Sequence, residues 1–395
     1  MYIVKNPNFN WLGKKWFFIG VSLILVMAGS ISLMVRGLNL GVDFTGGTLV
    51  FAKFREQPDI GRIRSALSEA GLQVEQVNLF GELSDNEVQI RMATIASEEA
   101  QDLSLESNQV VEALRSEYGA ASGESKGIDL NVIPRSELAN QLQRLDPENL
   151  RDQSSVTDLT QHYEALATRL TDYRTTHGGI IEDFSELEQI DLPGQVLSAL
   201  QENFHLGELH IISVESVGPK VGQEMKDRAL NAILFSLLGM LVYIAFRFRP
   251  IFGLAAIVAI FHDVFITLAV FSLTHKEISL TVIAALLTLV GYSINDTIVI
   301  FDRVRENLLT MRRTDMASVI NTSINQTLNR TILTSGGTLL AVSALYLLGG
   351  EVLSGFSFAL LIGIIVGTYS SIAIASPIVL WWQNYQQKKK AHVRA

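Results

Sequence analysis

The sequence lacks cysteine altogether, which excludes disulfide bonds, thiolate metal sites and cysteine nucleophiles. It also lacks a Walker loop, a dinucleotide-binding fingerprint and an H-E-x-x-H motif. Charged residues make up only 18 % of the 395 residues, whereas hydrophobic residues make up 48 %. We therefore expect neither an enzyme nor an ATPase, and no cofactor or metal, so any energy that the protein uses must come from another source.

Charge is divided unevenly along the chain. Residues 37–227 contain 14 Lys/Arg and 33 Asp/Glu, a balance of −19, and the remaining residues contain 17 and 7, a balance of +10. Long apolar runs occupy the less acidic part, and a helix needs about 20 mainly apolar residues to cross a bilayer. This division indicates two environments, a membrane and an aqueous compartment. The predicted transmembrane helices are 16–35, 229–246, 251–274, 278–301, 331–350 and 353–382.

Lysine and arginine near the ends of these runs predict the topology, because they concentrate on the cytoplasmic side of membrane proteins. If the six spans alternate in direction, 14 such residues fall on one side and the opposite short loops carry only Lys276. We therefore expect a multi-pass protein of the cell (inner) membrane, with the N-terminus (1–15) and the basic tail (383–395) in the cytoplasm and 37–227 outside it. The first run has no clear cleavage site and is interpreted as an uncleaved anchor. The 14 residues are Lys5, Lys14, Lys15, Arg247, Arg249, Arg303, Arg305, Arg312, Arg313, Arg330, Lys388, Lys389, Lys390 and Arg394.

The extracytoplasmic segment alternates strand and helix patterns in the order β-α-β-β-α-β, which is typical of ferredoxin-like domains. A polar, helix-prone insertion at about 120–206 interrupts this order. The second helix of the ferredoxin-like unit is either 98–118 or 194–204, and the sequence does not decide between them. The predicted fold is an α-helical polytopic membrane protein with an extracytoplasmic α+β domain that carries a helical insertion. The strand candidates are 48–54, 73–80, 87–92 and 208–217, and the first helix is 60–70.

Charged side chains inside membrane spans are costly, and they mark ion pathways or partner contacts. Asp296 lies about six residues, or ~8 Å, from the end of the fourth span, too deep for its short side chain to reach the interface. It is either a proton-exchanging group or a static polar contact between helices. Arg330 opens the fifth span near the same level, where it either forms a conditional ion pair with Asp296 or anchors the helix. His262 and Asp263 lie near the middle of the third span, as proton-handling or structural groups. Because adjacent helical positions differ by about 100°, we expect only one of them to face the bundle interior.

Two further patterns concern the last three spans. Small residues allow helices to approach closely, so four glycines are predicted to be packing positions. The loop at 302–329 has apolar residues at helical spacing, which predicts an amphipathic helix on the cytoplasmic membrane surface. The glycines are Gly336, Gly337, Gly363 and Gly367, and the apolar face of the loop is formed by Ala317, Ile320, Ile324 and Leu328.

Four motifs, in this order along the chain, resemble those of the SecF family of protein-export membrane subunits. G-V-D-F-T-G-G-T follows the first span at 41–48, and V-E-S-V-G-P-K-V-G precedes the second at 214–222. N-D-T-I-V-I-F-D-R-V-R-E-N at 295–307 covers the end of the fourth span and the residues after it. N-Q-T-L-N-R-T at 325–331 leads into the fifth span, and T-S-G-G lies inside it at 334–337. The resemblance covers both ends of the outer domain and the whole bundle. Its outer-domain motif residues are Gly41, Asp43, Phe44, Gly46, Gly47, Gly218 and Pro219.

The resemblance implies that the six spans form half of a resistance-nodulation-division (RND) bundle and pair with a SecD-like subunit. It also implies association with the SecY channel complex, a YajC-like accessory protein and exported unfolded polypeptides, and no nucleic-acid partner. The ion-coupling residues of the family map to Asp296 and Arg330, with Asn295 beside them and Asp263 as a further candidate, and the gradient is of protons or of sodium. The insertion at 120–206 departs from the smaller outer domain of the family.

Two other functions stay open at the level of sequence. One is a small-molecule transporter half of RND type, although such proteins usually carry twelve spans and two outer domains in one chain. The other is a scaffold that stabilises the export channel without transducing energy. The charged pair Asp296 and Arg330 argues against the scaffold, because a scaffold has no need of ionisable groups inside the membrane.

Overall fold

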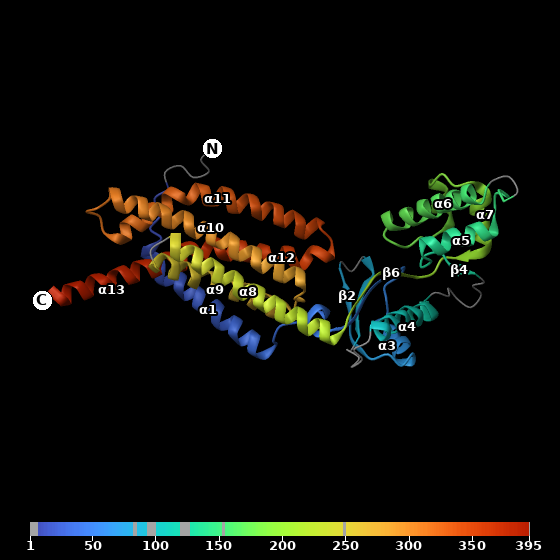
Figure 1. Cartoon of the computed structure of the whole chain (residues 1–395), viewed down its shortest axis with the longest axis horizontal. Helices are drawn as coiled ribbons and strands as arrows, with labels where there is room; N and C mark the ends of the chain where they lie inside the picture. The colour runs from blue at the N-terminus through green and yellow to red at the C-terminus, as the bar shows by residue number, and fades with distance from the viewer. Residues whose placement is uncertain are drawn as a thin grey trace. The chain divides into compact units, whose positions relative to one another are not determined.

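The structure is a computed structural model that describes residues 7–81, 85–92, 100–118, 127–151, 155–247 and 250–394. The expected segments 1–15, 98–118 and 120–206 therefore lie partly outside the described residues, as do Lys5 and Arg249 of the predicted topology. The chain forms two compact units (Figure 1). The bundle unit comprises Met1–Phe44 and Glu224–Ala395, and the sheet unit comprises Thr45–Gln223.

Within the described residues, six helical segments are long and apolar enough to cross a membrane. Helix α8 begins at Pro219, before the predicted span at 229, because the helical backbone continues into polar residues that hydropathy does not count. A π-helical turn, η4, interrupts the last segment. The helices are η1 (Leu12–Lys14), α1 (Lys15–Val35), α2 (Val42–Thr45), α8 (Pro219–Arg247), α9 (Pro250–Thr274), α10 (Leu280–Thr310), α11 (Met316–Leu348), α12 (Glu351–Ser370), η4 (Ser371–Ala375) and α13 (Ser376–Arg394).

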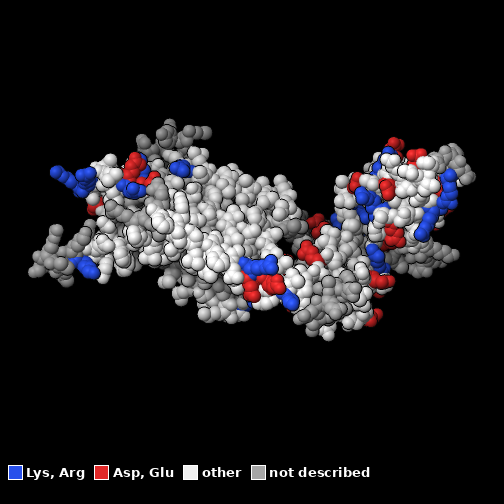
Figure 2. Space-filling view, in the orientation of Figure 1, with Lys and Arg blue, Asp and Glu red and all other residues white. Residues whose placement is uncertain are grey.

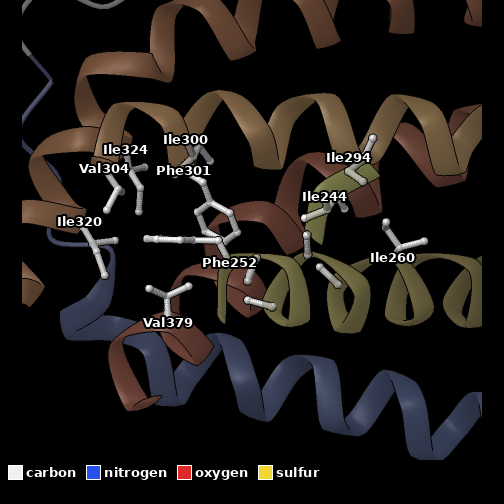
Figure 3. Packing of buried hydrophobic residues seen from close by; sticks show 14 of the residues in the cluster. Ile244, Phe252, Ile260, Ile294, Ile300, Phe301, Val304, Ile320, Ile324 and Val379 are labelled. Atoms are coloured by element: carbon white, nitrogen blue, oxygen red, sulfur yellow. The ribbon is translucent and has the colours of Figure 1, made fainter. Parts of the chain in front are cut away.

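The third, fourth and sixth spans form the centre of the bundle, and half of an apolar stretch of 18 residues in each is buried inside it. In the cluster that Figure 3 shows, Phe252 of α9 packs against Phe301 of α10 with ring centroids 5.0 Å apart. In α8, by contrast, only 6 % of the 18 residues that make up its apolar stretch are buried. Figure 2 shows few charged side chains on the visible face of the bundle between its ends. Such a surface is suited to contact with lipid or with another apolar protein surface.

The sheet unit contains an antiparallel sheet with the strand order β2-β3-β1-β6. Val50 of β1 pairs with Ile90 of β3 on one side and with Val214 of β6 on the other. Val110 and Leu114 of α4 are buried against this sheet, so 98–118 rather than 194–204 supplies the second helix. The predicted ferredoxin-like fold is confirmed. Its elements are β1 (Gly47–Phe54), α3 (Ile60–Glu69), β2 (Val74–Phe80), β3 (Glu87–Met92), α4 (Ala100–Tyr118) and β6 (Leu209–Val217).

The helical insertion, residues 127–207, has a hydrophobic core of its own around Leu142, Tyr163 and Leu170. Val196 and Leu200 of α7 belong to this core, which explains why α7 does not complete the ferredoxin-like unit. The short strands β4 and β5 pair in parallel and join the two ends of the insertion. Its elements are β4 (Ile128–Asp129), α5 (Arg135–Leu145), α6 (Val156–Thr176), η3 (Phe184–Gln189), α7 (Gly194–Asn203) and β5 (Phe204–His205).

The expectation of a separate amphipathic element at 302–329 is wrong. Helix α10 continues to Thr310 and α11 begins at Met316, so only a short turn separates them. The apolar residues expected to face the membrane surface pack between helices instead, and Ile320 and Ile324 share a buried cluster with Val304 of α10 (Figure 3). Helical spacing of apolar residues predicts that a face is buried, but it does not identify what buries it.

Candidate ion-coupling site

Asp296 is a buried carboxylate at the junction of three helices. It lies on α10 with 2 % of its surface exposed. The hydroxyl of Ser335 on α11 donates a hydrogen bond of 2.9 Å to its Oδ2, and the hydroxyl of Thr368 on α12 makes a longer contact of 3.5 Å with the same oxygen. A buried carboxyl group needs such partners, because burying it without them is costly. Asp296 therefore links α10 to both α11 and α12.

Arg330 does not pair with Asp296 in this structure. It is an exposed residue of α11, and among the described residues no ion pair joins it to the carboxylate. Ser335, five residues further along α11, occupies that position instead. Positions five residues apart point about 140° away from each other around a helix, so the two side chains cannot face α10 from the same direction. The expected ion pair would require a change in the position of α11 or in the side chain of Arg330.

Asp263 is a second buried carboxylate, with no exposed surface. Its Oδ2 accepts hydrogen bonds from Ser293 of α10 at 2.5 Å and from Ser370 of α12 at 2.8 Å. Its Oδ1 lies 3.0 Å from Nδ1 of His262. Both side chains are almost fully buried, and only 9 % of the His262 side chain is exposed, so the expectation that only one of them faces the bundle interior is wrong. The other ring nitrogen of His262, Nε2, is buried and has no hydrogen-bond partner among the described residues.

Hydroxyl groups of α10 and α12 lie around the two carboxylates, and we refer to them as the seam. Ser293 and Asp296 lie on adjacent turns of α10, and Thr368 and Ser370 lie on α12. Beyond them, the hydroxyls of Thr297 and Ser371 are 2.8 Å apart at the start of the π-helical turn. Such turns occur frequently at functional sites. Sequence analysis did not single out these hydroxyls, although the polar run T-Y-S-S at 368–371 inside an apolar span was a usable signal.

Asn295 faces away from this seam. Its side chain is exposed on another face of α10, about 100° around the helix from Asp296, where it lines an open groove of about 470 Å³ between α8 and α10. The structure therefore separates Asn295 from its neighbour Asp296. The described residues contain no cluster of three His, Asp or Glu side chains that could hold a metal ion. The groove is lined by Phe235, Ser236, Gly239, Met240, Tyr243, Gly291, Ile294, Asn295 and Ile298.

The four glycines differ in their surroundings. A Cβ atom at Gly363 would lie 2.5 Å from the side chain of Leu289, and one at Gly367 would lie 3.1 Å from Ser293. These two positions let α12 approach α10 beside Asp263. A Cβ at Gly336 or Gly337 would have no neighbour within 4 Å. Among the described residues, these two glycines therefore make no close helix contact of the expected kind.

The motif that follows α1 holds the first turn of α10. Oδ2 of Asp43 accepts a hydrogen bond of 2.8 Å from the backbone N–H of Leu280, and Gly41 N–H donates one of 2.8 Å to the carbonyl of Ile278. Phe44 is buried beside α10 in the same cluster as Val282. Asp43 thus caps the N-terminus of the helix that carries Asp296 from outside that helix, 237 residues before Leu280 in the sequence. Such a long-range cap leaves no local signal in the sequence.

The glycine pair of the same motif begins the sheet unit. Gly46 and Gly47 have φ angles of +74° and +115°, which favour glycine. A Cβ at Gly46 would lie 2.9 Å from Cα of Pro219, and Gly47 pairs with Val217. The two outer-domain motifs, which are far apart in sequence, therefore meet at one end of the sheet, next to Gly218.

These features define a class: a six-span, RND-like membrane subunit with the sequence motifs of the SecD/SecF proteins. The family described as "Protein export membrane protein SecD/SecF, C-terminal" matches residues 196–385, and the one described as "SecD/SecF GG Motif" matches residues 31–53. The solved structure of SecDF from Thermus thermophilus, a translocon-associated membrane protein, is 29 % identical with a TM-score of 0.65. It matches 97 % of this chain, whereas this chain spans only 40 % of the SecDF chain.

Proteins named protein translocase subunit SecF match this chain over almost its whole length. The one from Koribacter versatilis is 44 % identical, over 98 % of this chain and 94 % of its own. The one from Rhodothermus marinus is 48 % identical, over 96 % of this chain and 95 % of its own length. The chain belongs to the SecF family of Sec protein translocase subunits.

Proposed function

We propose that this SecF-family chain works with a SecD-like subunit to couple an ion gradient to the movement of exported, unfolded polypeptides across the cell inner membrane. The observation that carries the proposal is the Asp296 carboxylate, buried between α10, α11 and α12 and held by the hydroxyls of Ser335 and Thr368. A hydroxyl group can donate to an ionised carboxylate or accept from a protonated one. Asp296 can therefore change its protonation state without losing its partners.

The charge of Asp296 would drive the movement. When the carboxyl loses its proton, the low dielectric of the bundle strengthens its attraction to a cation. Arg330 is the cation that α11 carries near this level, and pairing with Asp296 would shift α11 relative to α10. One charge that crosses a potential of 100 mV supplies about 2.3 kcal/mol, which is enough to bias a two-state equilibrium. Asp263 would act in the same seam as a second ionisable group, because Ser293 ties it to the helix that carries Asp296.

A SecD-like subunit would complete the bundle. Six spans correspond to one half of a two-repeat transporter, and the solved SecDF chain is much longer than this one. The weakly buried helix α8 and the open groove that contains Asn295 offer a surface for a partner helix. Both termini would then lie in the cytoplasm and the sheet unit outside it, and the SecY channel complex and a YajC-like protein would be further partners of the pair.

The test is gradient-driven completion of export in vesicles that contain this chain and its partner. Asp296→Asn keeps the size of the side chain but removes its charge, and we expect it to abolish the gradient-dependent part of export while abundance and partner binding stay normal. Glu306→Gln, which neutralises an exposed carboxylate on the same helix, is the matched control and should behave like the wild type. Imposed proton and sodium gradients would identify the coupling ion. Normal export by Asp296→Asn would refute the coupling role and favour a scaffold.

A further inference from the structure

Two asparagine side chains of α11, those of Asn325 and Asn321, fasten the segment before α1 to this helix. Oδ1 of Asn325 accepts hydrogen bonds from the backbone N–H of Phe9 at 3.1 Å and from the indole N–H of Trp11 at 3.2 Å. Its Nδ2 donates to the carbonyl of Phe9 at 2.9 Å and to that of Asn321 at 3.0 Å. Both donors and both acceptor sites of this amide are thus used, in a residue that is only 7 % exposed. We refer to residues Phe9–Leu12 as the N-terminal strap.

Asn321, one turn earlier on α11, makes the second attachment. Its Oδ1 accepts from the backbone N–H of Leu12 at 3.0 Å, and its Nδ2 donates to Oδ1 of Asn10 at 3.0 Å. Oδ1 of Asn10 also accepts from the N–H of Gly13 at 2.9 Å. Unpaired N–H groups at the start of a helix need acceptors, and here α11 supplies one of them to the turn that leads into α1. Leu12 adds an apolar contact, because it lies in the buried cluster that contains Ile320.

Helix α11 is packed very differently along its length. From Val319 to Ser335 it contributes most of its buried residues, whereas beyond Ser335 the buried residue is Val342. Leu340, Leu347 and Leu348 in the outer part are at least 75 % exposed. Arg330 and Ser335 therefore lie between a fastened end and a loosely packed end of the same helix.

We propose that Asn321 and Asn325 are positioning residues that keep α11 attached to the N-terminal strap throughout the working cycle. This attachment sets the position of α11 along its axis and its rotation beside α10. It thereby sets the distances from Arg330 and Ser335 to Asp296. The proposal rests on the ion-coupling function in one respect: the groups that it positions are those of the coupling site. The strap stays in place, and the part of α11 beyond Ser335 moves.

The first test substitutes the asparagine in the full chain, reconstituted with its partner. Asn325→Leu removes all four hydrogen bonds, and we expect gradient-driven export to fall about tenfold and its pH dependence to shift, because displacement of positioned groups is costly. Asn325→Asp has the same shape but loses both donors, and it should give an intermediate loss with normal abundance. Asn8→Leu changes an exposed asparagine next to the strap and should export like the wild type. Normal export and an unchanged pH profile in Asn325→Leu would overturn the proposal.

The second test replaces the attachment with a covalent bond. Asn10→Cys and Asn321→Cys together remove one attachment, and a short bifunctional maleimide can link only this pair, because the chain has no other cysteine. Before linking, export should be reduced, and linking should restore it to the wild-type level. A linked protein that remains inactive would show that the strap must detach during the cycle, which would overturn the proposal.

The yield of the cross-link between residues 10 and 321 tests the attachment of the strap independently of the ion-coupling function. Adding Asn325→Leu to the double-cysteine chain should lower the yield severalfold relative to adding Asn8→Leu, whether or not Asp296 carries ions. An unchanged yield would mean that Asn325 does not hold the strap. Normal export by Asp296→Asn with a lowered linking yield would refute the coupling function but leave the attachment intact.

Discussion

Asp146 of the sheet unit differs from the two buried carboxylates of the bundle unit, Asp263 and Asp296, in its hydrogen-bond donors. In the bundle unit, the described donors to Oδ2 of Asp263 and of Asp296 are hydroxyl groups from neighbouring helices. In the sheet unit, Asp146 accepts from the backbone N–H groups of Leu150 and Arg151 as well as from the hydroxyl of Tyr163. A backbone N–H can only donate, so it favours the ionised carboxylate, whereas a hydroxyl can serve either protonation state.

The lowered pKa of Asp146 agrees with its having backbone N–H donors. Burial acts to raise it, but the hydrogen bonds from Tyr163, Arg151 and Leu150 outweigh burial and lower the pKa below its ordinary value. Asp146 is therefore built to remain charged and to fix a turn at the end of α5. The described donors to Oδ2 of Asp263 and of Asp296 include no backbone N–H, so their hydroxyl partners can serve either protonation state.

Among substitutions that test the comparison between hydroxyl and backbone donors, we expect the largest loss of stability at Asp263. Asp263→Ala removes the acceptor of two buried hydroxyls and of His262, and should cost about 2–4 kcal/mol of stability, because buried polar groups lose their partner. Asp263→Asn should cost clearly less, since its amide can still bond to hydroxyls that reorient. Thermal unfolding of the purified protein in detergent measures both. Equal losses in the two variants would mean that the seam requires the charge and is as fixed as the site of Asp146.

A smaller effect is expected at the glycine that lets α12 reach this seam. The methyl group of Gly367→Ala would press on Ser293, and we expect a loss of about 1–3 kcal/mol from overpacking. Gly336→Ala places its methyl in open space on α11, so it should be neutral or stabilising by up to about 1 kcal/mol through helix propensity. The same unfolding measurement compares them. A loss at Gly336 would indicate that a neighbour, such as a partner helix in the purified complex, covers this face.

The smallest effect is expected at Asp146. Asn tolerates the left-handed backbone that Asp146 adopts, at φ +43°, so Asp146→Asn tests the hydrogen bonds alone. We expect a loss of about 1 kcal/mol at neutral pH in urea unfolding of the isolated segment 45–223. Because the folded pKa is lowered, the wild-type advantage is complete above the ordinary pKa of 3.8 and disappears as the pH falls through the lowered value. An advantage that persists in strong acid would contradict the role of the charge.

Local sequence patterns were sufficient to predict much of the architecture. Apolar runs long enough to span a bilayer gave helices in the structure, and the alternation of strand and helix patterns gave the ferredoxin-like sheet, because both signals depend on residues close in sequence. The burial of Asp296 could also be predicted, since an ionisable residue inside an apolar run is too costly to expose to lipid and faces the bundle interior. The choice between 98–118 and 194–204 could not, because both are amphipathic and only packing against the sheet or the insertion distinguishes them.

The sequence by itself determined which segments lie in apolar surroundings, which family the motifs resemble and which carboxylates stand out. Only the tertiary structure decided which groups those carboxylates contact. It turned His262 towards Asp263, directed Asn295 away from Asp296, brought Ser335 rather than Arg330 to Asp296, and placed Asp43 on α10 and the strap on α11. The contacts of Ser335, Asp43 and the strap join residues on different elements, and some of these residues are more than 230 positions apart. Hydrogen bonds of that kind depend on how helices pack, and the spacing of residues along one helix does not encode it.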